Sequence, residues 1–138
     1  PRPDRLIYLS SSMHRSGHAD LADPDWEARP WNAAQAYCDS KLHLTMLAMA
    51  LGAHWPECII AAVDPGWVAT RMGGASAPVS IEQGAATPVW IASTEVQLSS
   101  GYFVDLHREP PAPVTLDRAK QTALLAVLAS RTGSPLPA

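Results

Sequence analysis

The chain has few cysteines, no long apolar run and no excess of basic residues. Each of these absences excludes a class of protein. Only 2 of its 138 residues are cysteines, and Cys38 and Cys58 form neither a disulfide framework nor a zinc-binding pattern. The apolar stretches are far shorter than the roughly 20 residues that span a bilayer. A formal net charge of −3 gives no basic surface for nucleic acid. We therefore expect a cytoplasmic protein with no membrane span and no nucleic-acid partner.

Metal ligands are also scarce. His14 and His18 are four residues apart, a spacing that would suit a metal ion on a helix. However, Ser16 and Gly17 lie between them, and no carboxylate pattern completes a set of ligands. We expect no metal site, and a solvated loop around the two histidines.

What the chain does have is a globular composition, with 47% hydrophobic and 17% charged residues. Three apolar, β-prone runs alternate with three helix-like segments, at 6–9, 33–53, 58–63, 80–93, 101–105 and 116–130. Asn32 and Ser80 are suitable N-caps for the first two helices, and each is followed three residues later by a glutamine. Buried strands that alternate with helices indicate an α/β fold with a parallel sheet.

Three strands are few for such a sheet. They would leave at least one long, apolar edge without hydrogen-bond partners, which folded proteins avoid. The sequence therefore predicts that residues 1–138 are incomplete as an independent domain.

The long helix predicted at 33–53 is apolar on two sides, since successive side chains turn by about 100°. The stripe expected to face the sheet consists of Tyr37, Lys41, Leu44, Leu47, Ala48 and Leu51. The opposite stripe consists of Leu42, Met46, Met49 and Ala53, with Asp39, His43 and His54 in a polar strip between the two. Another helix of the chain or a partner subunit should cover the opposite stripe, so a homo-oligomer is one expectation.

Tyr37 and Lys41 lie one helical turn apart. In one interpretation the lysine extends its charge from the helix start to solvent, and the tyrosine packs in the core. In the other, the ammonium stabilises the phenolate. A tyrosine hydroxyl is otherwise a poor proton donor at neutral pH, so the pair could then exchange a proton with an alcohol oxygen.

Three motifs in order resemble the short-chain dehydrogenase/reductase family. A strand ending in Ser10-Ser11-Ser12 precedes the helix with Tyr37-x-x-x-Lys41, and the next strand ends in Asp64-Pro65-Gly66-Trp67-Val68-Ala69-Thr70. The spacing of serines, His14 and Arg15 is similar to the Ser-Ser-x-x-His-Arg of the retinol-dehydrogenase-like branch. The resemblance extends from about residue 5 to 105 and implies the C-terminal half of a Rossmann-like, doubly wound parallel sheet.

The resemblance also implies roles for particular residues. Tyr37 would be the proton donor and acceptor, Lys41 would stabilise its phenolate and bind the nicotinamide ribose, and Ser11 would hydrogen-bond the substrate oxygen. Ser12 is the alternative to Ser11, because the serine triplet leaves the register open by one. The loop expected to hold the nicotinamide end of NAD or NADP contains Pro65, Gly66, Val68 and Thr70.

The chain departs from the family pattern in its first half. The glycine-rich turn that places the pyrophosphate at a helix N-terminus is absent, since none of the eight glycines forms that pattern. We therefore expect an inactive fragment, the C-terminal catalytic half of an NAD(P)-dependent oxidoreductase that interconverts an alcohol and a carbonyl. The tryptophans Trp26, Trp31 and Trp67 hint at a lipophilic substrate. A non-catalytic binding or regulatory relative and a purely structural fragment remain alternatives.

Overall fold

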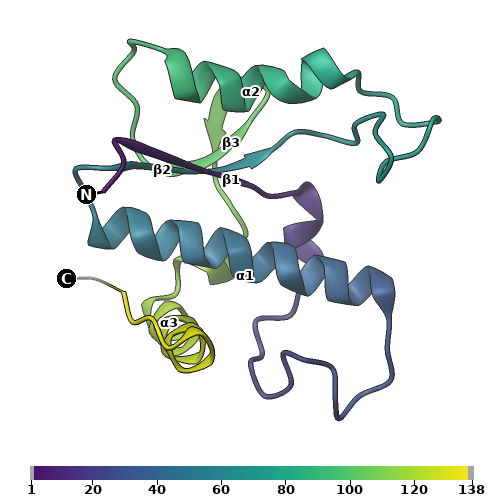
Figure 1. The fold of residues 1–138 in the computed structure, drawn as a ribbon, viewed down its shortest axis with the longest axis vertical. Helices are drawn as coiled ribbons and strands as arrows, with labels where there is room; N and C mark the ends of the chain where they lie inside the picture. Colours follow the sequence, from purple (N-terminus) through teal and green to yellow (C-terminus); the bar gives the residue numbers. More distant parts are fainter. Residues whose placement is uncertain (1, 137–138) are drawn as a thin grey trace.

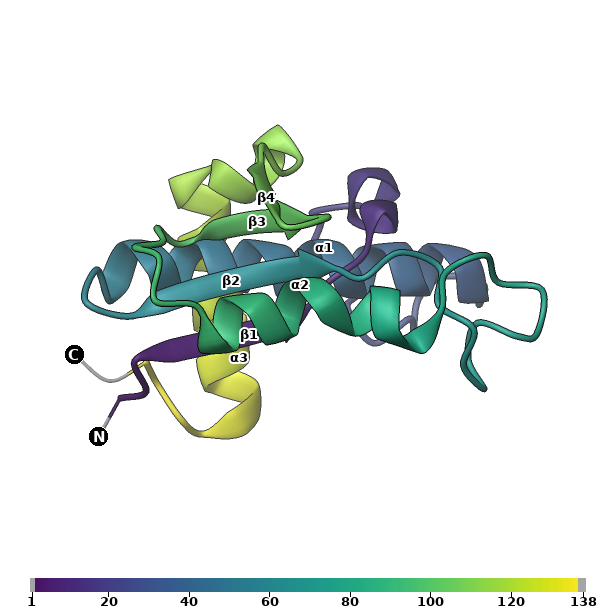
Figure 2. The same cartoon turned by 90° about the horizontal axis from the view of Figure 1, so that it is seen from above.

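A computed structural model of the chain describes residues 2–136, and its centre is a four-stranded sheet. Strands β1 (Arg5–Leu9), β2 (Ile59–Asp64) and β3 (Gly101–Val104) are parallel, and β4 (His107–Glu109) pairs antiparallel with β3. Figure 2 shows the strands side by side in this order, with β1 at one edge. The expected parallel α/β sheet is therefore present, and a short hairpin strand extends it.

The helices cover both faces of the sheet. Helix α1 (Ala33–His54) lies on one face and α2 (Ile81–Ser93) on the other, while α3 (Arg118–Thr132) packs on the far side of α1 (Figure 1). Two 3-10 helices, η1 (Ser12–Ser16) and η2 (Pro113–Leu116), also pack against α1. This layering is that of a doubly wound sheet.

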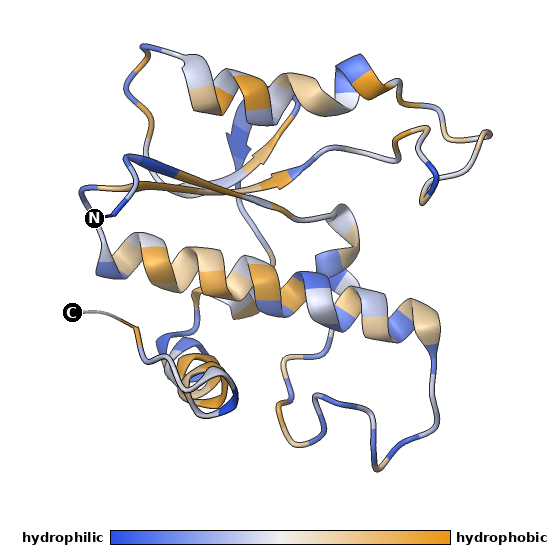
Figure 3. Cartoon of the chain, viewed as in Figure 1, coloured by the Kyte–Doolittle hydropathy of each residue, from blue (hydrophilic) through white to orange (hydrophobic). Residues whose placement is uncertain are grey.

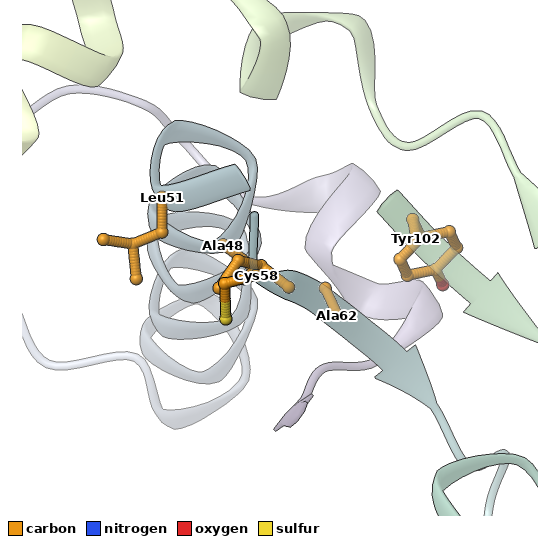
Figure 4. Packing of buried hydrophobic residues seen from close by; sticks show 6 residues of the cluster. Ala48, Leu51, Cys58, Ala62 and Tyr102 are labelled. Atoms are coloured by element: carbon orange, nitrogen blue, oxygen red, sulfur yellow. The ribbon is translucent and has the colours of Figure 1, made fainter. Parts of the chain in front are cut away.

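Each face of the sheet buries its own apolar cluster. On the α1 face, Ala48 and Leu51 pack with Cys58, Ala62 and Tyr102 (Figure 4). The strands β1 and β2 are apolar for most of their length, as Figure 3 shows, because both of their faces are covered. On the α2 face, the cluster consists of Ala61, Val63, Ile91 and Phe103.

The helix caps largely follow the expectations from sequence. The Asn32 side chain accepts a hydrogen bond from the backbone N–H of Gln35, and Ser80 and Gln83 form a complete capping box. Gly133 ends α3 in the left-handed conformation, at φ +66°. The last helix begins at Arg118, two residues later than predicted, because residues 113–116 form η2 and Asp117 caps α3 instead.

Most of the expected opposite stripe of α1 is covered, and only its last member, Ala53, is exposed. Leu42 and Met46 are fully buried, and Met49 packs against the cluster on the sheet side. A Cβ added to Gly17 would lie 2.6 Å from the Leu42 Cβ, so the residue after η1 packs directly on this helix. Covering these residues thus requires only η1, η2 and α3 of the same chain, and a partner subunit is not needed there.

The outer edge of β1 has no neighbouring strand among the described residues. The strand is apolar and partly buried, and Leu9 at its end is 53% exposed. Arg5 of this edge strand donates from its guanidinium to the backbone carbonyls of Ile91 and Thr94, at the C-terminal end of α2. No helix within residues 2–136 is long and apolar enough to cross a membrane.

Candidate active site

Most of the residues singled out from sequence lie either just beyond the carboxyl ends of β1 and β2 or in the N-terminal part of α1. Ser11 follows β1, and the loop that begins at Pro65 follows β2. The N-terminal part of α1 packs on η1, and its Lys41 bonds the Leu9 carbonyl at the end of β1. Figure 1 shows these segments together at the end of the sheet to which β1 and β2 point. Parallel α/β sheets bind ligands beyond the carboxyl ends of their strands.

Lys41 is held between Tyr37 and the end of β1. Its Nζ donates a 2.8 Å hydrogen bond to the Leu9 carbonyl oxygen and lies 5.6 Å from the centre of the Tyr37 ring. Both side chains are half-buried. Burial lowers the pKa of the Lys41 ammonium below its ordinary value. An ammonium has three N–H donors, so two remain for other partners after the bond to Leu9.

The three consecutive serines lie in three different environments. Ser10 is 3% exposed, and its Oγ lies 2.6 Å from the Oγ1 of Thr45, which itself donates to the Lys41 carbonyl oxygen. Ser11 is half-buried, and its Oγ accepts a hydrogen bond from the backbone N–H of Met13. Ser12 is exposed within η1. The Ser10 hydroxyl is therefore used in a buried hydrogen bond. The Ser11 hydroxyl only accepts from Met13, so its own O–H can still donate to another group.

The loop after β2 is internally hydrogen-bonded. Gly66 has φ +81°, a conformation that favours glycine, and its N–H donates to the Asp64 carboxylate. Val68 forms an isolated bridge with Val79, and the Thr70 Oγ1 accepts from the Gly73 N–H. The loop thus has a defined shape, and it extends beyond the sheet in Figure 2.

His14 does not lie in a solvated loop, which corrects the expectation from sequence. Its side chain is fully buried, with Nδ1 2.8 Å from the Ser11 carbonyl oxygen and Nε2 accepting from the Ala112 N–H at 2.9 Å. Its ring packs on that of Tyr102. No group of three or more possible metal ligands occurs within residues 2–136.

Asp39 is a second buried polar residue, which sequence periodicity placed in the polar strip between the two apolar stripes of α1. It is 4% exposed and accepts hydrogen bonds from the His18 backbone, the Gln35 amide and the Arg29 guanidinium. Arg29 also lies over the Trp26 ring, 3.6 Å from its centre. Asp39 therefore holds both ends of the long loop before α1.

A hollow of the surface lies away from the candidate catalytic residues. It encloses about 630 Å³ and is lined by residues 17–21 together with Val114, Lys120 and Ala123. Ser11, Tyr37 and Lys41 do not line it.

The chain is similar over nearly its whole length to several oxidoreductases, although no family model matches it. It is 33% identical to short-chain dehydrogenase chry4 of Gibberella zeae and 34% identical to short-chain dehydrogenase chyC of Penicillium rubens, covering 98% and 99% of this chain but 54% and 55% of those proteins. It is 29% identical to human retinol dehydrogenase 13, over 98% of this chain and 47% of that protein. The chain thus spans about half the length of these relatives.

Solved structures share the same fold. A crystal structure of an uncharacterized protein from Mycobacterium paratuberculosis superposes with a TM-score of 0.80 at 20% identity, covering 98% of this chain and 52% of that one. Carbonyl reductase Sniffer of Drosophila melanogaster superposes with a TM-score of 0.55 at 21% identity, covering 77% and 40% respectively. These similarities establish the Rossmann-like α/β fold.

Proposed function

Because the chain is a relative of the short-chain dehydrogenases and reductases, we propose that it is the C-terminal catalytic half of an NAD(P)-dependent oxidoreductase that interconverts an alcohol and a carbonyl. The observation that carries this proposal is that Lys41 bonds the Leu9 carbonyl at the end of β1, two residues before Ser11, while its Nζ lies 5.6 Å from the centre of the Tyr37 ring. The loop that begins at Pro65 follows β2, the parallel strand next to β1. In this proposal residues 1–138 form the catalytic half, and the N-terminal cofactor-binding half lies outside the sequence described.

Each of the three catalytic side chains has a distinct task in this mechanism. In the reducing direction Tyr37 donates its hydroxyl proton to the substrate oxygen, and Lys41 stabilises the phenolate that remains. Ser11 donates a hydrogen bond to the same oxygen as negative charge develops there. The bond from Lys41 to Leu9 fixes the ammonium over the Tyr37 ring, so that the charge is already in place when the proton leaves.

The residues present fit one end of a nicotinamide cofactor. Bound NAD(P)H would supply the hydride that reaches the carbonyl carbon. Lys41 has unused N–H donors for a ribose hydroxyl, and the loop with Pro65, Gly66, Val68 and Thr70 is already shaped by its own hydrogen bonds. The described chain has no glycine-rich turn for the pyrophosphate, so we propose that the isolated chain is inactive and holds the cofactor weakly.

The open β1 edge supports the same assignment. An apolar strand with unpaired N–H and C=O groups needs a neighbour. The relatives are about twice as long as this chain, which leaves ample sequence to supply one. We propose that a strand of the cofactor-binding half pairs with the outer edge of β1. Segments next to that added strand would then form one side of the substrate site.

Other features bear on the polarity of the substrate, the cellular compartment and the oligomeric state. Trp67 and Met13 are 57% and 43% exposed near the candidate site, which supports a small alcohol or carbonyl substrate of lipophilic character. The two buried free thiols, Cys38 and Cys58, support a reducing compartment such as the cytoplasm. A homo-oligomer remains part of the proposal, through surfaces other than the one formed by Leu42 and Met46.

A comparison of two proteins tests this function. The full-length protein should bind NADH or NADPH and reduce at least one member of a panel of apolar ketones and aldehydes, followed by nicotinamide absorbance. The isolated 138-residue chain should show neither turnover nor micromolar cofactor binding by calorimetry. Failure of the full-length protein to bind either cofactor would favour the non-catalytic alternative, and tight binding by the isolated chain would contradict the division into halves.

A further inference from the structure

His14 is a buried polar residue that the proposed mechanism does not use. Its imidazole is 0% exposed, although a histidine in a polar stretch of sequence normally reaches solvent. It lies in η1, three residues after Ser11, and contacts three separate parts of the chain. These are the Ser11 carbonyl, the backbone of Ala112 in the segment after β4, and the Tyr102 ring on β3.

The hydrogen bonds determine which nitrogen carries the proton. The Ala112 backbone N–H can only donate, so Nε2 must present a lone pair to it. A neutral imidazole then carries its single proton on Nδ1, which donates to the Ser11 carbonyl oxygen at 2.8 Å. Burial also lowers the His14 pKa, which favours this neutral form. Both ring nitrogens are thereby satisfied in the interior.

Ser11 depends on η1 for the position of its hydroxyl. The Ser11 Oγ accepts from the Met13 N–H in the first turn of η1, and its carbonyl accepts from both the backbone and the ring of His14. Arg15 of η1 also bonds the segment after β4, through an exposed hydrogen bond from its guanidinium to the Pro110 carbonyl. His14 is therefore the buried anchor of the turn that carries Ser11.

We propose that neutral His14 is a positioning residue for Ser11: its Nδ1–H holds the Ser11 carbonyl while its Nε2 is fixed by the Ala112 N–H. This inference rests on the proposed function, since it gives Ser11 a catalytic hydroxyl to position. A displacement of less than about 1 Å at a catalytic group is enough to reduce turnover strongly. The segment after β4 is thereby mechanically linked to the catalytic serine.

The test is a double-mutant cycle in the full-length protein. His14→Gln and His14→Asn are each made alone and together with Ser11→Ala, and kcat and the cofactor KM are measured for all. Gln can keep an acceptor near Ala112 but loses the donor to Ser11, whereas the shorter Asn keeps an N–H near the position of Nδ1. His107→Gln, at an exposed position on β4, is the matched control.

The proposal predicts that His14→Gln lowers kcat by about tenfold or more, leaving the cofactor KM within about twofold. In the Ser11→Ala background the same change should lower kcat by less than about twofold, because no hydroxyl remains to be positioned. Asn should retain more kcat than Gln despite filling less of the cavity, and His107→Gln should match the parent. If His14→Gln does not fold, as judged by circular dichroism, His14→Phe carries the cycle, because it fills the cavity with a ring but has no N–H donor for the Ser11 carbonyl.

Two results overturn the inference, and they are distinguishable from failure of the proposed function. An equal loss of kcat in both backgrounds, or no loss at all, means that His14 does not act through Ser11. A Tyr37→Phe variant measured in parallel reports on the proposed function itself. If it keeps parental turnover, the proposed function fails and the inference with it, whereas loss of its turnover together with an additive His14 effect refutes the inference alone.

Discussion

The Lys41 ammonium donates to the carbonyl oxygen of Leu9, the last residue of β1, at 2.8 Å. This bond joins the helix that carries Tyr37 to the strand that leads into Ser11. Ser10, the residue after β1, makes a second connection to α1, through Thr45. The candidate catalytic residues are therefore set by hydrogen bonds between β1 and α1, and each bond can be removed separately.

Removal of the Lys41 charge should impair both chemistry and cofactor binding. We expect Lys41→Met to lower kcat by at least about 10²-fold and to raise the cofactor KM. Because burial lowers the Lys41 pKa, wild-type kcat/KM should fall on the alkaline side before an ordinary lysine would titrate. Lys41→Arg stays charged at the alkaline pH at which Lys41 loses its proton. The activity of Lys41→Arg relative to wild type should therefore be higher at that alkaline pH than at neutral pH. An alkaline limb that is identical in wild type and Lys41→Arg would contradict the assignment.

The serine triplet should separate stability from activity. Ser10→Ala removes a buried hydrogen bond to Thr45 and should lower the free energy of unfolding by about 1 kcal/mol, with little change in kcat. Ser11→Ala should lower kcat and leave the free energy of unfolding nearly unchanged. Ser12→Ala should change neither quantity strongly. Thermal denaturation and steady-state kinetics on the three full-length variants measure this. A larger loss of kcat in Ser12→Ala than in Ser11→Ala would move the catalytic register by one residue.

Asp39 should stabilise the fold in a pH-dependent manner. Burial alone would raise the pKa of its carboxyl, but the hydrogen bonds from His18, Gln35 and Arg29 outweigh burial and lower it. A carboxyl whose pKa is lower when folded contributes stability above its unfolded value, near pH 4, and loses it as the pH falls through the folded value. Asp39→Asn should therefore cost roughly 1–3 kcal/mol at neutral pH and less in acid.

Urea denaturation at neutral and acidic pH measures this difference. The control is Asp4→Asn, at an exposed position before β1. Equal effects of the Asp39 substitution at both pH values would show that its charge does not stabilise the loop before α1.

The interior position of Met46 leads to a test of how α1 is covered. Met46 is 1% exposed, so Met46→Ala should lower the free energy of unfolding of the full-length protein by about 2–5 kcal/mol without changing its oligomeric state. The exposed Met72, at 86%, supplies a control substitution to alanine that should be nearly neutral. Dissociation of a native oligomer by Met46→Ala, with the subunit fold intact, would instead restore the interface interpretation.

The elements of the fold could be read from local signals, whereas the contacts between them could not. The runs of the three parallel strands and the Ser80–Gln83 capping box depend on neighbouring residues, and they appear close to where the sequence places them. The short β4 has three exposed, polar residues and no apolar pattern, so it exists only because β3 pairs with it. Its hairpin turn even places Leu106 at φ +64°, which sequence does not favour.

The site shows the same division. The motif order placed Ser11 just after a strand and Tyr37 and Lys41 near the start of the next helix, and the elements lie in that order. It could not predict that His14 and Asp39 are buried, since their partners Ala112 and Arg29 lie on segments whose approach depends on the fold. For α1, apolar residues on two sides indicated two covered faces, but periodicity alone could not show that the second cover comes from the same chain.

The most direct test of the central claim is turnover by Tyr37→Phe in the full-length protein. The substitution removes one hydroxyl from a half-buried side chain, so the fold and the cofactor dissociation constant should stay close to those of the parent. Turnover of a carbonyl substrate should fall by about 10²–10⁴-fold or more, because general acid catalysis is lost. Retention of activity within a few-fold of the parent, with the fold intact, would contradict the role of Tyr37 and with it the proposed oxidoreductase mechanism.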